Sequence, residues 1–252
     1  MRAAEGQIWA CGGGVQSSAI AALIVQGKLR PDLSCIVDTG REQSTTWDYM
    51  NSVIAPALAT VGVMLERVRK EDFATVDLYG GAEKDTLLLP AFTDITGEIG
   101  KLPTYCSNEW KTRVMQRWMR SKGVTNATVW LGISADEKRR MKSDKGANKY
   151  RHPLIELAMN RGECVATVLK MGWPMPPRSS CWMCPNHTQE EWRDIKENKP
   201  ADWQQAIQFD RDIRKKDPNA YLHGDCKPLE ECDFTDYNES LFSHCDSGMC
   251  FV

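Results

Sequence analysis

Apolar residues in the first 70 positions fall into short runs separated by polar and glycine-rich turns. The runs 8–11, 33–37 and 63–68 predict strands, and the longer patterns 17–27 and 45–61 predict helices, the second one kinked at Pro56. Repeated strand–helix–strand units are typical of a mostly parallel sheet with helices on both faces. The pattern therefore predicts the α/β fold class.

The pattern after residue 70 is less regular. Glycines and prolines between 70 and 105 indicate loops and short elements, whereas 107–122 predicts a helix and 128–133 a further strand. Residues 138–150 are basic and without apolar periodicity, which predicts a mobile loop.

The last third of the chain is predicted to be helical and then irregular. The helical pattern starts at Glu163, and Thr188 with Glu191 forms a capping box at the start of another helix. Residues 202–215 predict one more helix, and the acidic segment from Asp217 predicts loops. We therefore expect a sheet domain over 1–157 and a helical, cysteine-rich subdomain over 158–252.

The most informative segment is Cys-Gly-Gly-Gly-Val-Gln-Ser-Ser at 11–18, between the first predicted strand and helix. Glycines let backbone N–H groups approach a ligand closely, and a helix N-terminus adds unpaired donors and a partial positive charge. Ser17 and Ser18 add hydroxyl groups. The segment predicts a phosphate cradle, with a tight turn that needs glycine as the alternative. It lacks the lysine of a Walker loop and the third glycine of a Rossmann fingerprint.

Charge is unevenly distributed in this chain of 252 residues with net charge -2. Residues 101–151 hold thirteen Lys and Arg against four Asp and Glu, and 217–252 hold one Lys against eight acidic residues. The basic stretch suits a phosphate-bearing partner, and an ordinary solvated surface explains it equally well. No apolar run is long enough to span a bilayer, and the N-terminus leads directly into the first predicted strand. We expect a cytoplasmic protein with reduced thiols and no membrane partner.

Ten cysteines in a reducing compartment indicate metal binding or catalysis. Cys181 and Cys184 form a Cys-x-x-Cys pair, whose spacing suits zinc, an iron–sulfur cluster or a redox dithiol. Cys35 and Cys164 lie in a predicted strand and helix, so we expect them to be buried apolar residues. Further candidate ligands are Cys106 (before a predicted helix, where the helix dipole favours a thiolate), His187, Cys226, Cys232, His244, Cys245 and Cys250.

The glycine segment resembles the PP-loop of ATP pyrophosphatases and PAPS reductases, whose usual form is Ser-Gly-Gly-x-Asp-Ser. Gly12 stands where the first serine is usual, and Gln16 where aspartate is usual. Further segments resemble the family in the same order along the chain, and the Cys-x-x-Cys-Pro segment is similar to one found in a subgroup from bacteria and phages. These segments are 36–40, 106–111, 131–140, 150–156 and 180–187. The resemblance runs from about Ile8 to Arg214.

The resemblance implies an adenine nucleotide α-hydrolase-like fold that binds ATP, or a related adenine nucleotide, with Mg2+. The residues it implies for nucleotide binding are Gly12, Gly13, Gly14, Gln16, Ser17, Ser18, Asp38, Thr39 and Arg139. Asp38 and Thr39 would lie beside the nucleoside, and Lys111, Asp136 and Arg140 would act in catalysis.

In the wider superfamily, a Cys-x-x-Cys pair and one distant cysteine often hold a [4Fe–4S] cluster. Here Cys106, Cys181 and Cys184 would be the three ligands, leaving one iron open, or Cys250 or Cys245 would close the cluster. Zinc is the alternative metal.

The resemblance leads us to expect an enzyme that adenylates a substrate with release of pyrophosphate, for iron–sulfur-dependent sulfur transfer. A nucleic-acid substrate would suit the basic stretch, and a sulfur donor or partner protein is implied. One alternative is a sulfonucleotide reductase that uses a cysteine thiolate. Another is a nucleotide-binding subunit of a larger assembly, without catalytic activity and with a structural metal.

Overall fold

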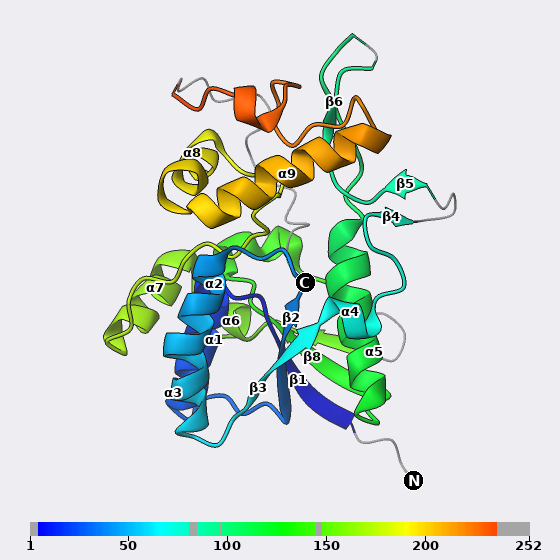
Figure 1. Cartoon of the computed structure of the whole chain (residues 1–252). Coiled ribbons are helices and arrows are strands. Elements are labelled where there is room, and N and C mark those ends of the chain that lie inside the picture. The colour runs from blue at the N-terminus through cyan, green and yellow to red at the C-terminus, as the bar shows by residue number, and fades with distance from the viewer. Residues whose placement is uncertain (1–4, 81–84, 96, 145–147, 236–252) are drawn as a thin grey trace.

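The computed structural model describes residues 5–80, 85–95, 97–144 and 148–235 of the chain, and its centre is a five-stranded parallel sheet (Figure 1). The strand order is β3-β2-β1-β8-β9. The strands are β1 (Glu5–Cys11), β2 (Leu33–Asp38), β3 (Leu65–Arg69), β8 (Asn126–Leu131) and β9 (Asn148–Arg151). Ile8 pairs with Leu33 on one side and with Val129 on the other. The predicted α/β class is confirmed.

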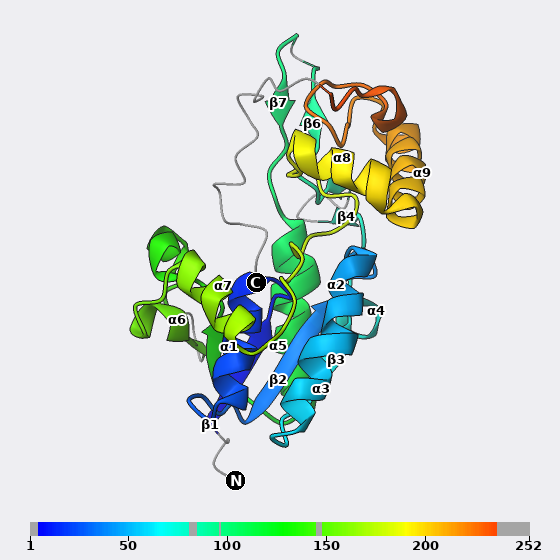
Figure 2. The ribbon, with the colours of Figure 1, turned by 90° about the vertical axis from the view of Figure 1, so that its left-hand side faces the viewer.

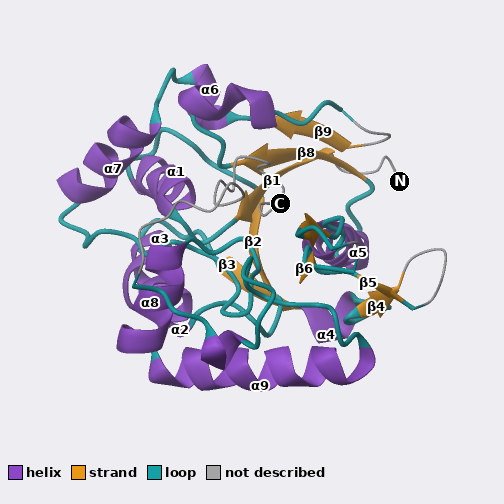
Figure 3. Cartoon of the chain, turned by 90° about the horizontal axis from the view of Figure 1, so that it is seen from above, coloured by secondary structure: helices purple, strands orange, loops and turns teal. Residues whose placement is uncertain are grey.

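Helices cover both faces of this sheet, as the view from above shows (Figure 3). One face carries α1 (Val15–Val25), α2 (Ser44–Tyr49), α3 (Ala55–Ala59), α6 (Pro153–Glu156) and α7 (Arg161–Lys170). The other carries α4 (Lys70–Phe73) and α5 (Arg113–Ser121). Neighbouring strand residues serve the two layers, because side chains alternate along a strand. Trp9 packs in the α1 layer and Ile8 in the α5 layer.

The helix predicted over 45–61 is one helical path with a wider turn inside it. Between α2 and α3 lies the π-helical turn η1 (Met50–Ile54), directly before Pro56. Proline has no N–H to donate and its ring crowds the preceding turn, which a π-turn relieves. A second π-helical turn, η2 (Asn108–Thr112), leads into α5, and the helix predicted over 107–122 is confirmed.

The prediction of a loop over 138–150 is wrong at both ends of that range. The 3-10 turn η3 (Ala135–Arg140) covers its start, and β9 pairs in parallel with β8 at its end, with Val129 opposite Tyr150. β9 is a polar edge strand, so backbone pairing rather than an apolar pattern defines it. Residues 145–147 lie outside the described part of the chain.

The irregular middle of the chain contains short elements, as predicted. Two small antiparallel pairs occur: β4 (Tyr79–Gly80) with β5 (Thr86–Leu87), and β6 (Phe92–Thr93) with β7 (Gly100–Lys101). These pairs lie above the sheet, beside the C-terminal helices (Figures 1 and 2).

The last described part contains α8 (Gln189–Asn198), α9 (Pro200–Lys216) and the 3-10 turn η4 (Leu229–Glu231). The predicted capping box is present: Thr188 accepts the Glu191 N–H, and Glu191 accepts the Thr188 N–H at 2.9 Å. These elements pack in an apolar cluster around Trp192, Trp203 and Phe234, which also takes in Leu87 and Trp110 from the middle of the chain. By contrast, α7 packs against α1 on the sheet. In the described residues, no helix is both long enough and apolar enough to cross a membrane.

Candidate functional site: a nucleotide-sized cavity beside a cysteine site

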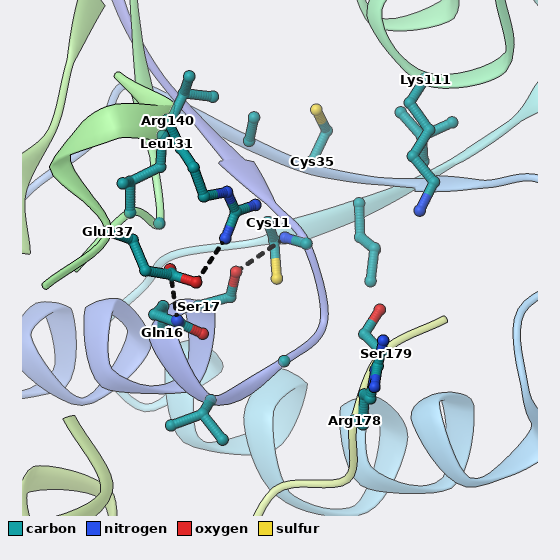
Figure 4. Close-up of a pocket in the computed structure, with 18 of the residues that line it drawn as sticks. Cys11, Gln16, Ser17, Cys35, Lys111, Leu131, Glu137, Arg140, Arg178 and Ser179 are labelled. Atoms are coloured by element: carbon teal, nitrogen blue, oxygen red, sulfur yellow. Dashed lines mark hydrogen bonds and ion pairs between the residues drawn. The ribbon is translucent and has the colours of Figure 1, made fainter. Parts of the chain in front are cut away.

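A cavity of about 380 Å³ opens where the carboxyl ends of β1, β2 and β8 meet (Figure 4). The chain leaves β1 toward α1 on one face, and α5 on the other face leads into β8, so strand order reverses between β1 and β8. Ligands of open α/β sheets bind at such a switch point. The fold therefore places a ligand-sized space beside the glycine segment.

The glycine segment forms one wall of the cavity, with Gly12, Gly14, Gln16 and Ser17 among its lining residues. The Gly12 N–H donates to Ser17 Oγ at 2.8 Å, so this hydroxyl holds the loop closed. Helix α1 starts after Gly14, which has no side chain to cap it. The cavity thus faces an uncapped helix N-terminus, which favours an anion.

Two glycines are required by close packing rather than by a ligand. Gly13 has φ +80°, and a Cβ there would lie 2.9 Å from Thr46 Cγ2. At Gly132, after β8, a Cβ would lie 3.3 Å from the Ser17 backbone nitrogen. The absence of a Cβ at Gly132 lets the β8 turn approach the first turn of α1 this closely.

Four cationic side chains line the cavity, from four separate segments: Lys111, Arg140, Arg161 and Arg178. Arg140 Nη1 lies 2.8 Å from Glu137 Oε1. Arg178 forms an ion pair with Glu191 at the start of α8. Two carboxylates, Glu42 and Glu137, line the same cavity. The lining is therefore polar and rich in positive charge near the glycine segment.

Gln16 connects two of these charged groups. Its Nε2 donates to Glu137 Oε2 at 2.9 Å, and its Oε1 accepts a longer bond of 3.4 Å from Arg161 Nη1. An amide can do both because it carries a donor and an acceptor. A carboxylate at this position would repel Glu137, which gives a physical reason for glutamine here.

Glu42 and Lys111 form an ion pair at the edge of the cavity. Lys111 Nζ lies 2.7 Å from Glu42 Oε1, and the Glu42 side chain is only 3% exposed. Glu42 Oε1 also lies 4.0 Å from Cys181 Sγ. One buried carboxylate therefore contacts both a cavity lysine and the cysteine site.

The structure places the other predicted nucleotide-binding residues around the cavity rather than in its wall. Asp38 accepts hydrogen bonds from the Gly40 N–H at 2.7 Å and from Arg67 Nε at 2.8 Å. Thr39 Oγ1 lies 3.7 Å from Cys181 Sγ. The β2 residues that line the cavity are instead Cys35, Ile36 and Val37. Ser18 donates to the Gly14 carbonyl at 3.0 Å.

Two predicted site residues of η3, Asp136 and Arg139, lie outside the cavity wall. Asp136 is exposed and accepts the backbone N–H of Arg161 at 3.1 Å. Although desolvation raises the pKa of Asp136, hydrogen bonds from Ser134 and from backbone N–H groups outweigh it, and the pKa is lowered. Arg139 is exposed, whereas its neighbour Arg140 lines the cavity.

Cys106, Cys181 and Cys184 are half-buried and lie near the Glu42 end of the cavity. Cys181 pairs with Glu42 in an isolated antiparallel bridge, and Cys184 donates its N–H to the Cys181 carbonyl at 3.1 Å. Burial, followed by the charge of Glu42, raises the pKa of the Cys181 thiol to about 12, and the adjacent Cys106 adds to this rise. Cys106 begins the helical path that η2 and α5 continue, as predicted.

The three thiols form an all-sulfur donor set. The sulfur atoms of Cys106, Cys181 and Cys184 are not all within 4.8 Å of one another. An all-thiolate donor set suits zinc and an iron–sulfur cluster alike, so the residues present fit either group. Cys245 and Cys250 lie outside the described residues.

The remaining predicted roles of cysteines concern packing. Cys35 is 1% exposed and Cys164 is fully buried, which confirms both predictions. Cys11 is buried beside the cavity, and desolvation raises its pKa to about 12. Trp182 and Trp192 are buried near the Cys-x-x-Cys segment.

Several cavity residues were not predicted from the sequence: Glu42, Glu137, Arg161, Arg178 and Ser179. Glu42 had a usable signal, because it follows the carboxyl end of β2, where a parallel sheet directs its loops to the ligand. Arg161 starts α7 and Arg178 precedes the Cys-x-x-Cys segment, and no sequence pattern connects either to the glycine segment.

Comparisons with known proteins identify no family for this chain. No protein-family model matches it, and no curated protein matches it. Among solved structures, it is similar to the U34-tRNA thiolase NcsA from Methanococcus maripaludis with its [4Fe-4S] cluster, at 13% sequence identity and a TM-score of 0.44. That match covers 91% of this chain and 73% of the other. The function proposed below therefore rests on the geometry of this chain.

Proposed function

We propose that the cavity binds ATP and that the protein activates a substrate by adenylation, for sulfur transfer at the adjacent cysteine site. The observation that carries this proposal is the convergence of the glycine segment, the N-terminus of α1 and four cationic side chains on one cavity. Phosphate groups bind at such helix N-termini and beside such cations. A volume of about 380 Å³ lies within the range of small-molecule sites.

The two ends of the cavity suit the two ends of a nucleotide. Ile36, Val37, Leu131, Ile133 and Met115 give an apolar wall that suits a planar base. The triphosphate would then lie over Gly12, Gly14 and Ser17, with Arg140 and Arg161 compensating its charge, and Mg2+ bound to the phosphates. Asp38 and Thr39 would support the nucleoside end from behind the wall rather than contact it.

The proposed reaction is attack by a substrate oxygen on the α-phosphorus of ATP. The P–O bond to pyrophosphate breaks, and pyrophosphate leaves with its charge compensated by the cavity cations. Lys111 suits this role because its ammonium lies at the cavity edge on Glu42. Asp136 would act as a positioning residue, since it fixes the start of α7, from which Arg161 enters the cavity. A sulfur nucleophile would then displace AMP from the substrate.

Cys106, Cys181 and Cys184 would hold the [4Fe–4S] cluster of this proposal. A cluster with three protein thiolates supplies one iron without a protein ligand, which is an acceptor for a sulfur atom. Glu42 and Thr39 contact Cys181 from the nucleotide side and would orient it. The position of the thiols beside Lys111 and Glu42 supports sulfur transfer to a substrate activated in the cavity.

The substrate class that we propose is a nucleic acid. Lys138, Arg139 and Lys142 are exposed next to Arg140, so a phosphate backbone could contact them while a base enters the cavity. Ion pairs hold other basic residues of 101–151, among them Lys111, Arg113, Lys122, Arg140 and Arg151. The predicted basic stretch is thus spread over several elements, and the η3 segment is the part that supports this proposal.

The test uses protein purified without oxygen. Titration with α,β-methylene ATP measures nucleotide binding, and iron and sulfide analysis of single Ala variants of Cys106, Cys181 and Cys184 measures the cluster, with Cys164→Ala as a buried control. Pyrophosphate release is then measured with ATP, sulfide and bulk tRNA or single-stranded DNA. Nucleotide binding, iron that is lost in all three variants and nucleic-acid-dependent pyrophosphate release would support the proposal.

Other results would identify a different function. Thioredoxin-dependent release of sulfite from PAPS, without pyrophosphate release, would indicate the sulfonucleotide reductase. Nucleotide binding with neither reaction would indicate a subunit without catalysis. Failure to bind the ATP analogue would overturn the assignment of the cavity itself.

A further inference from the structure

Three side chains with metal-binding atoms meet after α9, outside the site described above. Ligand atoms of His223, Asp225 and Cys232 all lie within 4.8 Å of one another. His223 Nδ1 lies 3.4 Å from Asp225 Oδ1. A nitrogen and an oxygen ligand on one tetrahedral zinc would lie about 3.3 Å apart. The His223–Asp225 pair therefore has the spacing of two zinc ligands, and the Cys232 sulfur lies within 4.8 Å of both.

The imidazole of His223 is oriented so that Nδ1 faces this group. Its Nε2 lies 3.2 Å from Gln189 Oε1 at the start of α8, and an amide oxygen requires Nε2 to be the protonated nitrogen. Nδ1 accepts the Asp225 backbone N–H at 3.2 Å, which a metal ion would replace. Phe234 packs edge-on against the ring at 5.4 Å between centroids. A ligating histidine whose second nitrogen donates to an oxygen is the usual arrangement around a metal.

The other two side chains differ in burial in a way that suits metal entry. Cys232 is 3% exposed, and its Sγ lies 3.5 Å from the Pro228 carbonyl, a weak hydrogen bond. The side chain of Asp225 is 41% exposed. The group is thus enclosed on the protein side and open to solvent through Asp225, which gives an ion a path in.

The surrounding segment has little regular structure to stabilise it. Between α9 and the end of the described chain, η4 is the one helical element. This segment lies on the side of α8 and α9 away from the sheet (Figures 1 and 2). The Leu229 N–H donates to Asp210 on α9 at 3.1 Å, and Arg193 on α8 donates to the Phe234 carbonyl. Irregular segments of this kind are where structural metals contribute folding free energy.

We propose that His223, Asp225 and Cys232 bind one zinc ion, with water as the fourth ligand, and that the ion cross-links the segment 221–234, which His223 joins to α8 through its hydrogen bond to Gln189. The mixed nitrogen, oxygen and sulfur donor set suits Zn2+. On binding, the Cys232 thiol releases its proton to solvent and the Zn–S bond forms. The site shares no residue with the nucleotide cavity or with the three cluster cysteines. The zinc proposal can therefore be tested independently of the proposed function.

The experiment measures zinc and iron per chain in protein from zinc-supplemented medium, followed by Co2+ titration of chelator-treated protein. We expect one zinc per chain in the wild type and in Cys181→Ser. We expect zinc to be lost in Cys232→Ser, and Zn2+ affinity to fall about 10–100-fold in Gln189→Ala, which removes the hydrogen bond to the histidine. Co2+ should give a thiolate charge-transfer band that Cys232→Ser abolishes.

Asp225→Asn tests the site in a variant that we expect to fold, because the Asp225 side chain is partly exposed. Its matched control is Asp233→Asn, an aspartate of the same segment whose carboxylate accepts two hydrogen bonds from Thr235. We expect weaker Zn2+ binding in the first variant and wild-type binding in the second, with equal circular dichroism. The proposal is overturned if the wild type binds neither Zn2+ nor Co2+, if Asp225→Asn and Cys232→Ser both keep wild-type zinc, or if Cys181→Ser is the variant that loses it.

Discussion

Gln16 Nε2 donates a hydrogen bond to Glu137 Oε2 at 2.9 Å, across 121 positions of sequence. This bond joins the first turn of α1 to the 3-10 turn that follows β8, the two segments on either side of the cavity. It also fixes the carboxylate that holds Arg140. The position of a cavity arginine therefore depends on an uncharged side chain in the glycine segment.

The substitution Gln16→Glu should weaken nucleotide binding. It places a second carboxylate against Glu137, and the repulsion displaces Glu137 and Arg140. We therefore expect the affinity for α,β-methylene ATP to fall about tenfold, which is ~1.4 kcal/mol of binding free energy. Isothermal titration measures the affinity. Gln26→Glu, the same change at the other end of α1, is the control and should bind as the wild type does. Equal affinity in both variants would show that the Gln16 amide has no role in the site.

Arg140 and Arg139 offer a matched pair of adjacent arginines. Arg140 lines the cavity, and its side chain is 13% exposed, whereas Arg139 is exposed outside the cavity wall. Because a charge-assisted contact to phosphate contributes about 1.5–3 kcal/mol, Arg140→Gln should lower nucleotide affinity at least tenfold. Arg139→Gln should change it less than about threefold, since exposed charges interact weakly across solvent. The reverse order of effects would assign the phosphate contact to Arg139.

Gly14 and Gly13 separate ligand binding from folding. A Cβ on Gly14 would meet Ser179 Cβ at an ordinary 3.8 Å, so Gly14→Ala should fold with stability within about 0.5 kcal/mol of the wild type. Its methyl group faces the cavity and should weaken nucleotide binding. Gly13→Ala should instead destabilise the fold by about 1–3 kcal/mol, because φ is +80° and the new Cβ would lie 2.9 Å from Thr46 Cγ2. Denaturant titration and nucleotide titration of both variants check this, and wild-type nucleotide affinity in Gly14→Ala would contradict it.

Asp77 predicts a pH dependence of stability. Partial burial would raise its pKa, but hydrogen bonds from Arg41 and Lys70 outweigh this effect and lower the pKa to about 2. A lowered carboxyl pKa stabilises the fold above the unfolded value of about 4, and this contribution is lost as the pH falls from about 4 to 2. The Asp77 side chain is 57% exposed, so solvent screening reduces the contribution at pH 7 to about 1 kcal/mol.

The variant Asp77→Asn should therefore lose about 1 kcal/mol of unfolding free energy at pH 7 and differ little from the wild type near pH 2. Urea denaturation at several pH values measures both. Asp85→Asn removes an 87% exposed carboxylate from an ion pair with Lys216 and should change stability much less. A constant difference between wild type and Asp77→Asn across the pH range would exclude titration of Asp77 as the cause.

The sequence by itself determined the elements whose signals are local. The alternation of apolar runs predicted the strands and helices of the sheet, because buried faces must repeat with the period of each element. The capping box at Thr188 and the disturbance before Pro56 were predictable for the same reason: each depends on neighbours a few residues away. The glycine segment marked the cavity because its glycines and its strand-to-helix position are adjacent in the chain.

Only the tertiary structure decided which side chains meet. β9 has no apolar pattern and exists because β8 supplies its backbone partners. Arg161 and Arg178 enter the cavity through the placement of α7 and of the segment before Cys181, and Glu42 joins the cysteines to the cavity through a bridge across 139 positions. These side chains meet because layers that are distant in sequence pack against one another. No local sequence pattern predicts which residues such packing brings together.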